Sequence, residues 1–484
     1  MQIAFVAPEC APWASTGGLG EVMRALPRQI ASMGHKVAVY LPYYRQVREQ
    51  APERTYAIRS LTIPYSYYSR FAAVLDGGVE DGVQTYFIDC PELFDREGLY
   101  AGATGEYTDN WERFGLLCRA VLEAVKQLGV PDVFHVHDWQ AALVPVYLRT
   151  LYTYDPLLRN RGAVLTIHNA GYQGMFPAQT TERLLFPWEI FTMDRLEHYD
   201  HFNFLKGGIA YADLITTVSP RYASEIQTAE YGEGLEGLLQ KRSTDLVGIL
   251  NGVDYQRWNP AADGNIAAHY SPENLAGKAE CRKDLLHAFG AGAVNDATAV
   301  LGMVTRLATQ KGIDLLEQIA EPLLRENVVL VALAEGEAYY EKVMRSMAER
   351  FSGRVLVKIA YDDTLAHKVE AGADMFLMPS RYEPCGLNQI YSMKYGTVPV
   401  VRATGGLDDT VEPWNAETRK GTGFKFQGYR PEDFLGAIRQ ALQLFEDKDA
   451  WHTLMRNGMA RDYSWGRSAA EYVEAYERVA RAKS

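Results

Sequence analysis

The chain begins with MQIAFVAPECAPWASTGGLGEV (residues 1–22), in which a short apolar run is followed by a glycine-rich loop and a helical pattern. Ile3–Ala7 is predicted to be a buried strand, because it is apolar and flanked by turn-forming residues. Glu21–Met33 then carries apolar residues at helical spacing. This strand, loop and helix form the first step of a strand–helix alternation, which is typical of parallel sheets covered by helices.

The same alternation continues through the chain and restarts after Asn251-Gly252. Further strands are predicted in the first half at Lys36–Leu41, Val133–His137, Ala163–Ile167 and Leu214–Val218, and in the second half at Ala299–Val304, Val328–Leu333, Val355–Ile359, Met375–Met378 and Val398–Val401. Two such series predict an α/β protein with two facing, doubly wound Rossmann-like domains. We expect an N-terminal domain over residues 1–250, a C-terminal domain over 251–460, and a terminal helix within 461–484 that packs back on the N-terminal domain.

Composition agrees with a globular protein of this size. At about 150 residues per domain, 484 residues predict two to three domains. The formal net charge of −12 disfavours general binding of nucleic acid or anionic membranes. Residues 1–9 lack the basic flank of a signal peptide, and no run of about 18 apolar residues is present. The five dispersed cysteines form no CxxC pair, so we expect buried free thiols and a cytoplasmic location.

The glycine-rich loop at Ser15-Thr16-Gly17-Gly18 precedes the first helix. Glycines at a helix start let backbone N–H groups approach an anion, and the helix dipole favours negative charge there. A dinucleotide site is disfavoured, because a G-x-G-x-x-G pattern begun at Gly18 would end on Met23. The remaining alternative at this stage is a tight turn that binds no ligand.

Two further groups of polar residues follow predicted strands in the first half. In His135-Val136-His137 the two histidines share one strand face, but no third ligand lies at useful spacing, so a structural pair is favoured over a metal site. Asp138 and Trp139 then come at the carboxyl end of the strand, where ligands bind. His168-Asn169 occupies the same position after Ala163–Ile167.

In the second half, Arg306 and Lys311 flank a turn after a predicted strand and suit a phosphate or diphosphate group. The alternative is a pair of exposed surface charges. Glu383 follows Met375–Met378 and is expected near a helix N-terminus that holds its carboxylate ionised. Cys385 is expected to pack rather than react, since no base is placed beside it.

Taken in order, these segments resemble the glycogen/starch synthase family of glycosyltransferases, and its bacterial glycogen synthases in particular, over nearly the whole chain. The resemblance is carried by Thr16-Gly17-Gly18-Leu19, Tyr107-Thr108-Asp109-Asn110, His137-Asp138-Trp139, His168-Asn169, Leu250-Asn251-Gly252-Val253-Asp254, Arg306-Leu307, Gln310-Lys311-Gly312, Glu383-Pro384-Cys385-Gly386-Leu387 and Thr404-Gly405-Gly406-Leu407. It implies a glycosyltransferase-B fold. It also implies a retaining transfer of glucose from ADP-glucose to the non-reducing end of an α-1,4-glucan, without cofactor or metal.

The resemblance also implies roles for single residues. The catalytic set is Glu383, Arg306, Lys311 and His168. The donor-binding set is Ser15, Gly17, Gly18, Glu21, Asn251, Tyr361, Cys385, Gly386, Leu387 and Thr404. The acceptor-binding set is Tyr107, Asp138, Trp139 and Asn169.

Two departures from the family pattern bear on the donor. Ser15 stands where the family usually has Lys, and Ala334-Glu335-Gly336-Glu337 stands where it usually has Gly-Ala-Gly-Asp. ADP-glucose, UDP-glucose and a small sugar acceptor therefore remain alternatives within the same fold. A catalytically silent glucan-binding protein is the alternative from another class.

Overall fold

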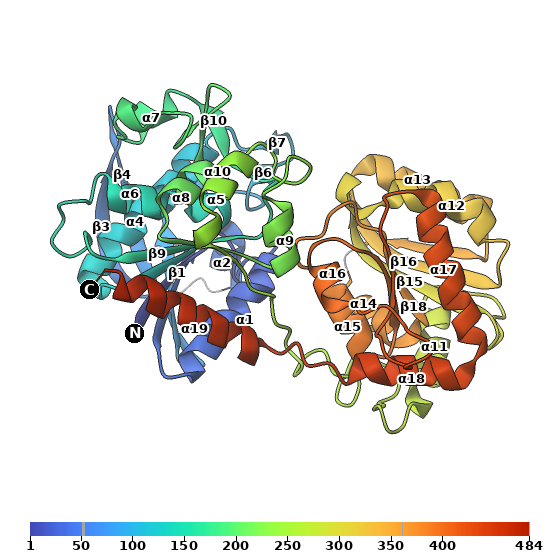
Figure 1. Cartoon of the computed structure of the whole chain (residues 1–484). Coiled ribbons are helices and arrows are strands. Elements are labelled where there is room, and N and C mark those ends of the chain that lie inside the picture. Colours follow the sequence, from blue (N-terminus) through green and yellow to red (C-terminus); the bar gives the residue numbers. More distant parts are fainter. Residues whose placement is uncertain (51–53, 361, 484) are drawn as a thin grey trace. The chain divides into compact units, whose positions relative to one another are not determined.

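Two mainly parallel sheets, one in each half of the chain, organise the protein (Figure 1). The computed structural model describes residues 1–50, 54–360 and 362–483. They divide into two compact units: unit 1 comprises Met1–Gly252 with the C-terminal segment from Trp465, and unit 2 comprises Val253–Ser464. The predicted boundaries at 250/251 and 460/461 lie slightly before these divisions.

In the described residues, the sheet of unit 1 has nine strands. Their order is β14 (Leu246–Gly248), β13 (Leu214–Thr217), β9 (Gly162–Ile167), β8 (Val133–His137), β1 (Gln2–Val6), β2 (Lys36–Pro42), β5 (Val83–Asp89), β4 (Ser69–Glu80) and β3 (Tyr56–Pro64). Pairing is parallel from β14 to β5, and β4 pairs antiparallel with both β5 and β3. The strands that sequence analysis predicted here are β1, β2, β8, β9 and β13.

Helices of unit 1 pack against this sheet in two groups. Helix α1 (Gly18–Ser32) contacts α19 (Trp465–Arg481), whereas α4 (Asn110–Leu128), α5 (Asp138–Ala141), α6 (Leu143–Arg149) and α8 (Phe204–Tyr211) contact one another (Figure 1). The shorter elements are α2 (Arg45–Gln50), α3 (Pro91–Phe94), β6 (Ala101–Gly102), β7 (Gly105–Glu106), β10 (Met175–Pro177), α7 (Thr180–Arg183), η1 (Trp188–Ile190), β11 (Glu197–His198), β12 (His201–Asn203), α9 (Pro220–Glu225), α10 (Glu236–Lys241) and η2 (Ser243–Asp245).

Unit 2 has a wholly parallel sheet, of six strands in its described residues. Their order is β17 (Val355–Ile359), β16 (Val328–Gly336), β15 (Ala299–Leu307), β18 (Met375–Met378), β19 (Val398–Arg402) and β20 (Phe424–Phe426). The helical elements are α11 (Ala276–Ala288), η3 (Thr309–Lys311), α12 (Ile313–Leu323), α13 (Ala338–Arg350), α14 (Asp363–Gly372), α15 (Asn388–Lys394), α16 (Gly405–Thr410), α17 (Pro431–Glu446) and α18 (Lys448–Met459).

Numbered along the chain, the strands of unit 2 follow the Rossmann order 3-2-1-4-5-6. The parallel strands of unit 1 have the same order, with β14 added at the edge. The order reverses between β1 and β8 in unit 1, and between β15 and β18 in unit 2. Ligands of such sheets bind beyond the carboxyl ends of the strands at this reversal, so the topology itself indicates where to look for a site.

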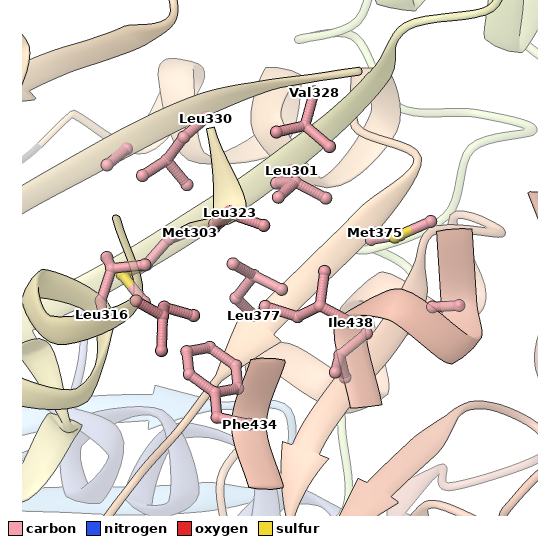
Figure 2. Close-up of a cluster of buried hydrophobic side chains, with 14 of the residues drawn as sticks. Leu301, Met303, Leu316, Leu323, Val328, Leu330, Met375, Leu377, Phe434 and Ile438 are labelled. Atoms are coloured by element: carbon pink, nitrogen blue, oxygen red, sulfur yellow. The ribbon is translucent and has the colours of Figure 1, made fainter. Parts of the chain in front are cut away.

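The core of unit 2 forms because its strands are apolar on both faces. Leu301 and Met303 of β15 pack on one face with Leu316 of α12 and Ile438 of α17 (Figure 2). Val300, the residue before Leu301 on β15, points to the other face and packs in a different cluster with residues of α11. This alternation explains why the strands of unit 2 appear in the sequence as short continuous apolar runs.

Helix α19 belongs to unit 1 although it follows unit 2 in the chain. Its Tyr476 is fully buried and its hydroxyl lies 2.8 Å from Nδ1 of His135 on β8. Ser468 donates to the carbonyl of Leu250 at 2.5 Å. Among all the described residues, no helix has the length and hydropathy needed to cross a membrane.

Removing a core side chain tests this packing. We expect Leu316→Ala to lower the free energy of unfolding of unit 2 by about 2–5 kcal/mol, because Leu316 is fully buried and truncation leaves a cavity. Urea unfolding followed by circular dichroism measures the change. Tyr339→Ala is the matched control, since this side chain is 67% exposed and surface changes stay within about 0.5 kcal/mol. Equal effects of the two substitutions would contradict the assigned core.

Candidate active site

Most of the predicted site residues lie in or beside loops at the carboxyl ends of strands near the two reversals of strand order, whereas Tyr107 follows β7 and Asn251 follows the edge strand β14. In unit 1 these loops follow β1, β8 and β9, and in unit 2 they follow β15, β18 and β19.

The loop after β1 exposes its glycines and is held by a buried carboxylate. Gly17 caps α1 and Gly18 is its first residue, both exposed to solvent. Glu9, only 4% exposed, accepts hydrogen bonds from the backbone N–H of Thr16 at 2.7 Å, the Thr16 hydroxyl at 2.7 Å and the Tyr100 hydroxyl at 2.6 Å. The glycine loop is therefore fixed in place while its backbone remains accessible.

The two other predicted donor residues of this loop lie beside the glycines. Ser15 is exposed and its hydroxyl donates to the carbonyl of Gly17 at 3.2 Å. Glu21 lies in the first turn of α1. The loop thus offers a helix N-terminus of the kind that binds anions, with one acidic residue in its first turn.

The ends of β8 and β9 bring Asp138 and His168 together. The Asp138 carboxylate accepts a hydrogen bond from the backbone N–H of His168 at 2.7 Å. Asp138 has φ +54°, a left-handed conformation that turns the chain sharply at the strand end. Burial raises the pKa of Asp138 to about 7, against the opposing effect of the backbone N–H groups of His168 and Asn169. Burial lowers the pKa of His168 to about 3, so its imidazole is neutral.

Trp139 and Asn169 are held by contacts with other residues of unit 1. Trp139 is 8% exposed and packs against Phe114 and Phe204, with Gly174 so close that a Cβ there would overlap the indole ring. The Asn169 side chain accepts from the backbone N–H of Gly171 at 2.9 Å.

Tyr107 and Asn251 differ in what their polar atoms contact. Tyr107 is half-buried and donates to the carbonyl of Glu97 at 2.6 Å. Asn251 is 5% exposed, and its Oδ1 is a buried acceptor without a hydrogen-bond partner in the described residues.

His135 and His137 form a structural pair. Their rings lie 4.1 Å apart, and both nitrogens of His135 are used, one by Tyr476 and the other by Thr166. Across the described residues, no three His, Cys, Asp or Glu side chains are grouped so that they could hold a metal ion. All five cysteines are buried and free.

In unit 2, Lys311 and Glu383 form a buried ion pair between the loops after β15 and β18. The ammonium of Lys311 lies 2.7 Å and 3.0 Å from the two carboxylate oxygens of Glu383. Ser380 donates to the same carboxylate at 2.9 Å, and Glu383 is only 6% exposed. A carboxylate buried to this degree needs such partners, because an unpaired charge out of water is strongly destabilising.

Two local expectations for unit 2 differ from the structure. β15 extends to Leu307, beyond the predicted end at Val304, so Arg306 is an exposed residue of the strand end, and Lys311 ends the η3 turn that follows. Glu383 lies before α15 begins at Asn388, and the nearby helix start contacts its backbone instead: the N–H of Gly406 in α16 donates to the Glu383 carbonyl at 3.1 Å. Lys311 and Ser380, rather than a helix N-terminus, hold the carboxylate.

Glycines let three loops of unit 2 approach one another. Gly312 and Gly405 have φ of +73° and +45°, and an added Cβ would lie 2.0 Å from the Pro379 carbonyl oxygen and 1.9 Å from that of Glu383. An added Cβ on Gly406 would lie 1.9 Å from the Cys385 carbonyl oxygen. No larger residue fits these positions without a backbone shift.

The predicted donor residues of unit 2 lie on these loops. Cys385 is 5% exposed and its carbonyl accepts from the Gln389 amide at 3.2 Å. Gly386 has φ +67°, Leu387 caps α15, and the fully buried Thr404 caps α16. Tyr361, the predicted stacking residue for the nucleobase, lies outside the described residues.

Known proteins similar to this chain share its whole length. The starch synthase catalytic domain family matches residues 2–241, and the glycosyl transferases group 1 family matches residues 288–456. A glycogen synthase from Koribacter versatilis (strain Ellin345) is 55% identical over 99% of this chain and 98% of its own. One from Anaeromyxobacter dehalogenans (strain 2CP-C) is 46% identical over 99% and 100%. The chain belongs to the glycogen/starch synthase family.

Solved structures agree with this family and with the predicted glycosyltransferase-B fold. The catalytic domain of starch synthase IV from Arabidopsis thaliana, bound to ADP and acarbose, matches with a TM-score of 0.88 and 32% identity, covering 99% of both chains. Sucrose-phosphate synthase from Thermosynechococcus elongatus matches with a TM-score of 0.60 at 15% identity, which shows likeness of fold alone.

Sequence reasoning missed the contacts through which several residues hold the predicted site residues. Glu9, Ser380 and His137 each hold a predicted site residue or its loop. Ser380 and Glu383 are three residues apart, a spacing at which a hydroxyl can reach a carboxylate, so this contact could have been suspected. The contact between Glu9 and Tyr100 spans 91 residues and leaves no local signal.

Substitution of Gly405 tests the close packing of these loops. We expect Gly405→Ala to expose the amide of Gly406 to hydrogen exchange at least about tenfold faster, because a Cβ would displace the Glu383 carbonyl that this amide binds. Exchange measured by mass spectrometry on peptides covering residues 383–410 gives the rate. Gly436→Ala in α17, where a Cβ meets nothing within 4 Å, is the control. Unchanged exchange in Gly405→Ala would contradict the loop geometry.

Proposed function

We propose that this chain transfers glucose from ADP-glucose to the non-reducing end of an α-1,4-glucan, as a glycogen or starch synthase that retains the α configuration. The full-length identity to glycogen synthases carries the proposal. The relative solved with ADP and acarbose supports the nucleotide sugar and the glucan as its two substrates.

The cations of unit 2 are proposed to act on the leaving diphosphate. Cleavage of the glycosyl–phosphate bond leaves extra negative charge on the diphosphate, and preorganised positive groups stabilise that charge. Lys311 uses two of its three N–H donors on Glu383, which leaves one for a phosphate oxygen. Arg306 adds an exposed guanidinium at the end of β15. With these two cations in place, the proposal requires no metal.

Glu383 is proposed to stabilise positive charge on the reacting glucose rather than to attack it. Three hydrogen bonds from Lys311 and Ser380 engage both of its oxygens. Such contacts occupy lone pairs of the carboxylate oxygens and make them less available for nucleophilic attack. We therefore favour attack by the acceptor hydroxyl on the same face that the diphosphate leaves.

The remaining residues are proposed to bind the two substrates. For the donor these are Ser15, Gly17, Gly18, Glu21, His168 and Asn251 of unit 1, and Tyr361, Cys385, Gly386, Leu387 and Thr404 of unit 2. For the glucan acceptor they are Tyr107, Asp138, Trp139 and Asn169. Trp139 is only 8% exposed, so its proposed effect on the acceptor passes through the shape of the loops it packs against, whereas Asp138 is partly exposed.

A transfer assay with two donors tests the proposed function. We expect incorporation of radiolabelled glucose from ADP-glucose into glycogen to exceed that from UDP-glucose, and to persist with a metal chelator. Glu383→Gln should lower kcat by about 100-fold or more, because a neutral amide cannot stabilise developing positive charge. Glu349→Gln, an exposed acid on α13, is the matched control.

Each other outcome of this assay identifies an alternative. Higher incorporation from UDP-glucose would identify UDP-glucose as the donor. Transfer to a free sugar instead of glycogen would identify a small sugar as the acceptor. Absence of transfer from both donors would favour a silent glucan-binding protein. Full activity of Glu383→Gln would refute the role given to this carboxylate.

The departure at Ser15 gives a second test. We expect Ser15→Lys to lower the KM for the sugar nucleotide by about two- to fivefold, because an exposed ion pair contributes up to about 1 kcal/mol. Ser60→Lys, at an exposed position of β3, adds the same charge elsewhere in unit 1 and is the control. Steady-state kinetics at fixed ionic strength measure both. A KM that is unchanged or raised would contradict the assignment of this loop to the donor phosphates.

A further inference from the structure

Two imidazoles meet at the carboxyl ends of β8 and β9. Nδ1 of His137 lies 2.9 Å from Nε2 of His168. His137 is fully buried and His168 is partly exposed. Burial holds the pKa of both rings well below the usual value for histidine, so both are neutral and each carries a single N–H. One ring therefore donates the hydrogen bond and the other accepts it.

The other nitrogen of His137 decides the direction. Nε2 of His137 is buried and has no hydrogen-bond partner in the described part of the chain. If His168 donated, the proton of His137 would sit on Nε2 as a buried N–H without an acceptor, which is rare and unfavourable in proteins. If His137 donates from Nδ1, only a lone pair is left unused. The second arrangement places the proton of His168 on its Nδ1.

Neighbouring groups keep both imidazoles in this orientation. The His137 ring is stacked on Phe5 with centroids 5.9 Å apart and lies 4.1 Å from His135. His135 is itself anchored by Tyr476 at 2.8 Å and Thr166 at 2.6 Å. The backbone of His168 is held by Asp138. Turning either ring over would break the hydrogen bond between the two imidazoles.

We propose that His137 is a positioning residue that fixes the tautomer of His168, so that His168 presents Nδ1–H as a neutral donor to a sugar hydroxyl oxygen. This inference rests on the proposed function for its ligand, a hexose. A neutral N–H suits a hydroxyl oxygen, whereas an unprotonated Nδ1 could only accept from that hydroxyl. Among the hydrogen bonds of the described residues, the His168 ring takes part only in the one from Nε2 to His137.

The tautomer can be measured in the wild-type protein without substrate. With ¹⁵N-labelled histidine, we expect the His168 signals to show a protonated Nδ1 and an unprotonated Nε2, assigned by their loss in His168→Gln. A protonated Nε2 on His168 would overturn the proposal. This result does not depend on activity, so failure of the transfer assay would refute the proposed function without affecting the tautomer.

Two variants of His137 link the tautomer to turnover. His137→Phe keeps the ring but removes the donor, and we expect kcat/KM for the sugar nucleotide to fall about 3- to 10-fold as His168 shifts toward the Nε2–H form. His137→Asn places an amide N–H where Nδ1 was and should restore both kcat/KM and the tautomer. The exposed His452→Asn is the control. If His137→Asn did not restore kcat/KM, or if the His168 tautomer were unchanged in His137→Phe, the role of His137 would be merely structural.

Discussion

Reversal of strand order in each sheet is the constraint on which the rest of the structure depends. Parallel strands need crossover helices, and at the reversal successive crossovers leave in opposite directions, so the strand ends there stay uncovered by the crossovers. In unit 1 this position holds the loops of Thr16 and Asp138, and in unit 2 those of Lys311 and Glu383. Each unit therefore assembles its polar groups from segments far apart in sequence. In both units these groups lie at the carboxyl ends of the strands beside the reversal.

The two units differ in the charge of the polar groups at their strand ends. Unit 2 buries the Glu383 carboxylate and must supply Lys311 and Ser380 as partners, and Arg306 adds a positive charge at the end of β15. Unit 1 instead holds His168 partly exposed but desolvated, with a pKa lowered to about 3, so that its imidazole is neutral. Charged groups stabilise a phosphoryl anion, and neutral hydrogen-bonding groups suit hydroxyls, so under the proposed function Lys311 would act on the diphosphate and His168 on a sugar hydroxyl.

Much of this arrangement could be predicted from sequence, because parallel strands are buried on both faces and leave continuous apolar runs. That signal fails for the antiparallel pair β3 and β4, which mixes exposed and buried positions and carries a register shift. Sequence order likewise predicted Asp138, His168 and Glu383 near strand ends. It did not indicate the role of Glu9, because a single acid after an apolar run looks like a strand terminator until its distant partners are known.

Helix α19 shows how a distant segment can determine a local geometry. It follows the whole of unit 2 in the chain, yet its Tyr476 binds the ring of His135, which packs against His137 and so supports His168. Without that tyrosine, Nδ1 of His135 would be a buried polar atom in need of another partner. The packing under the imidazole pair is thus complete only when the chain has passed through unit 2 and returned, and the position of His168 depends on both ends of the sequence.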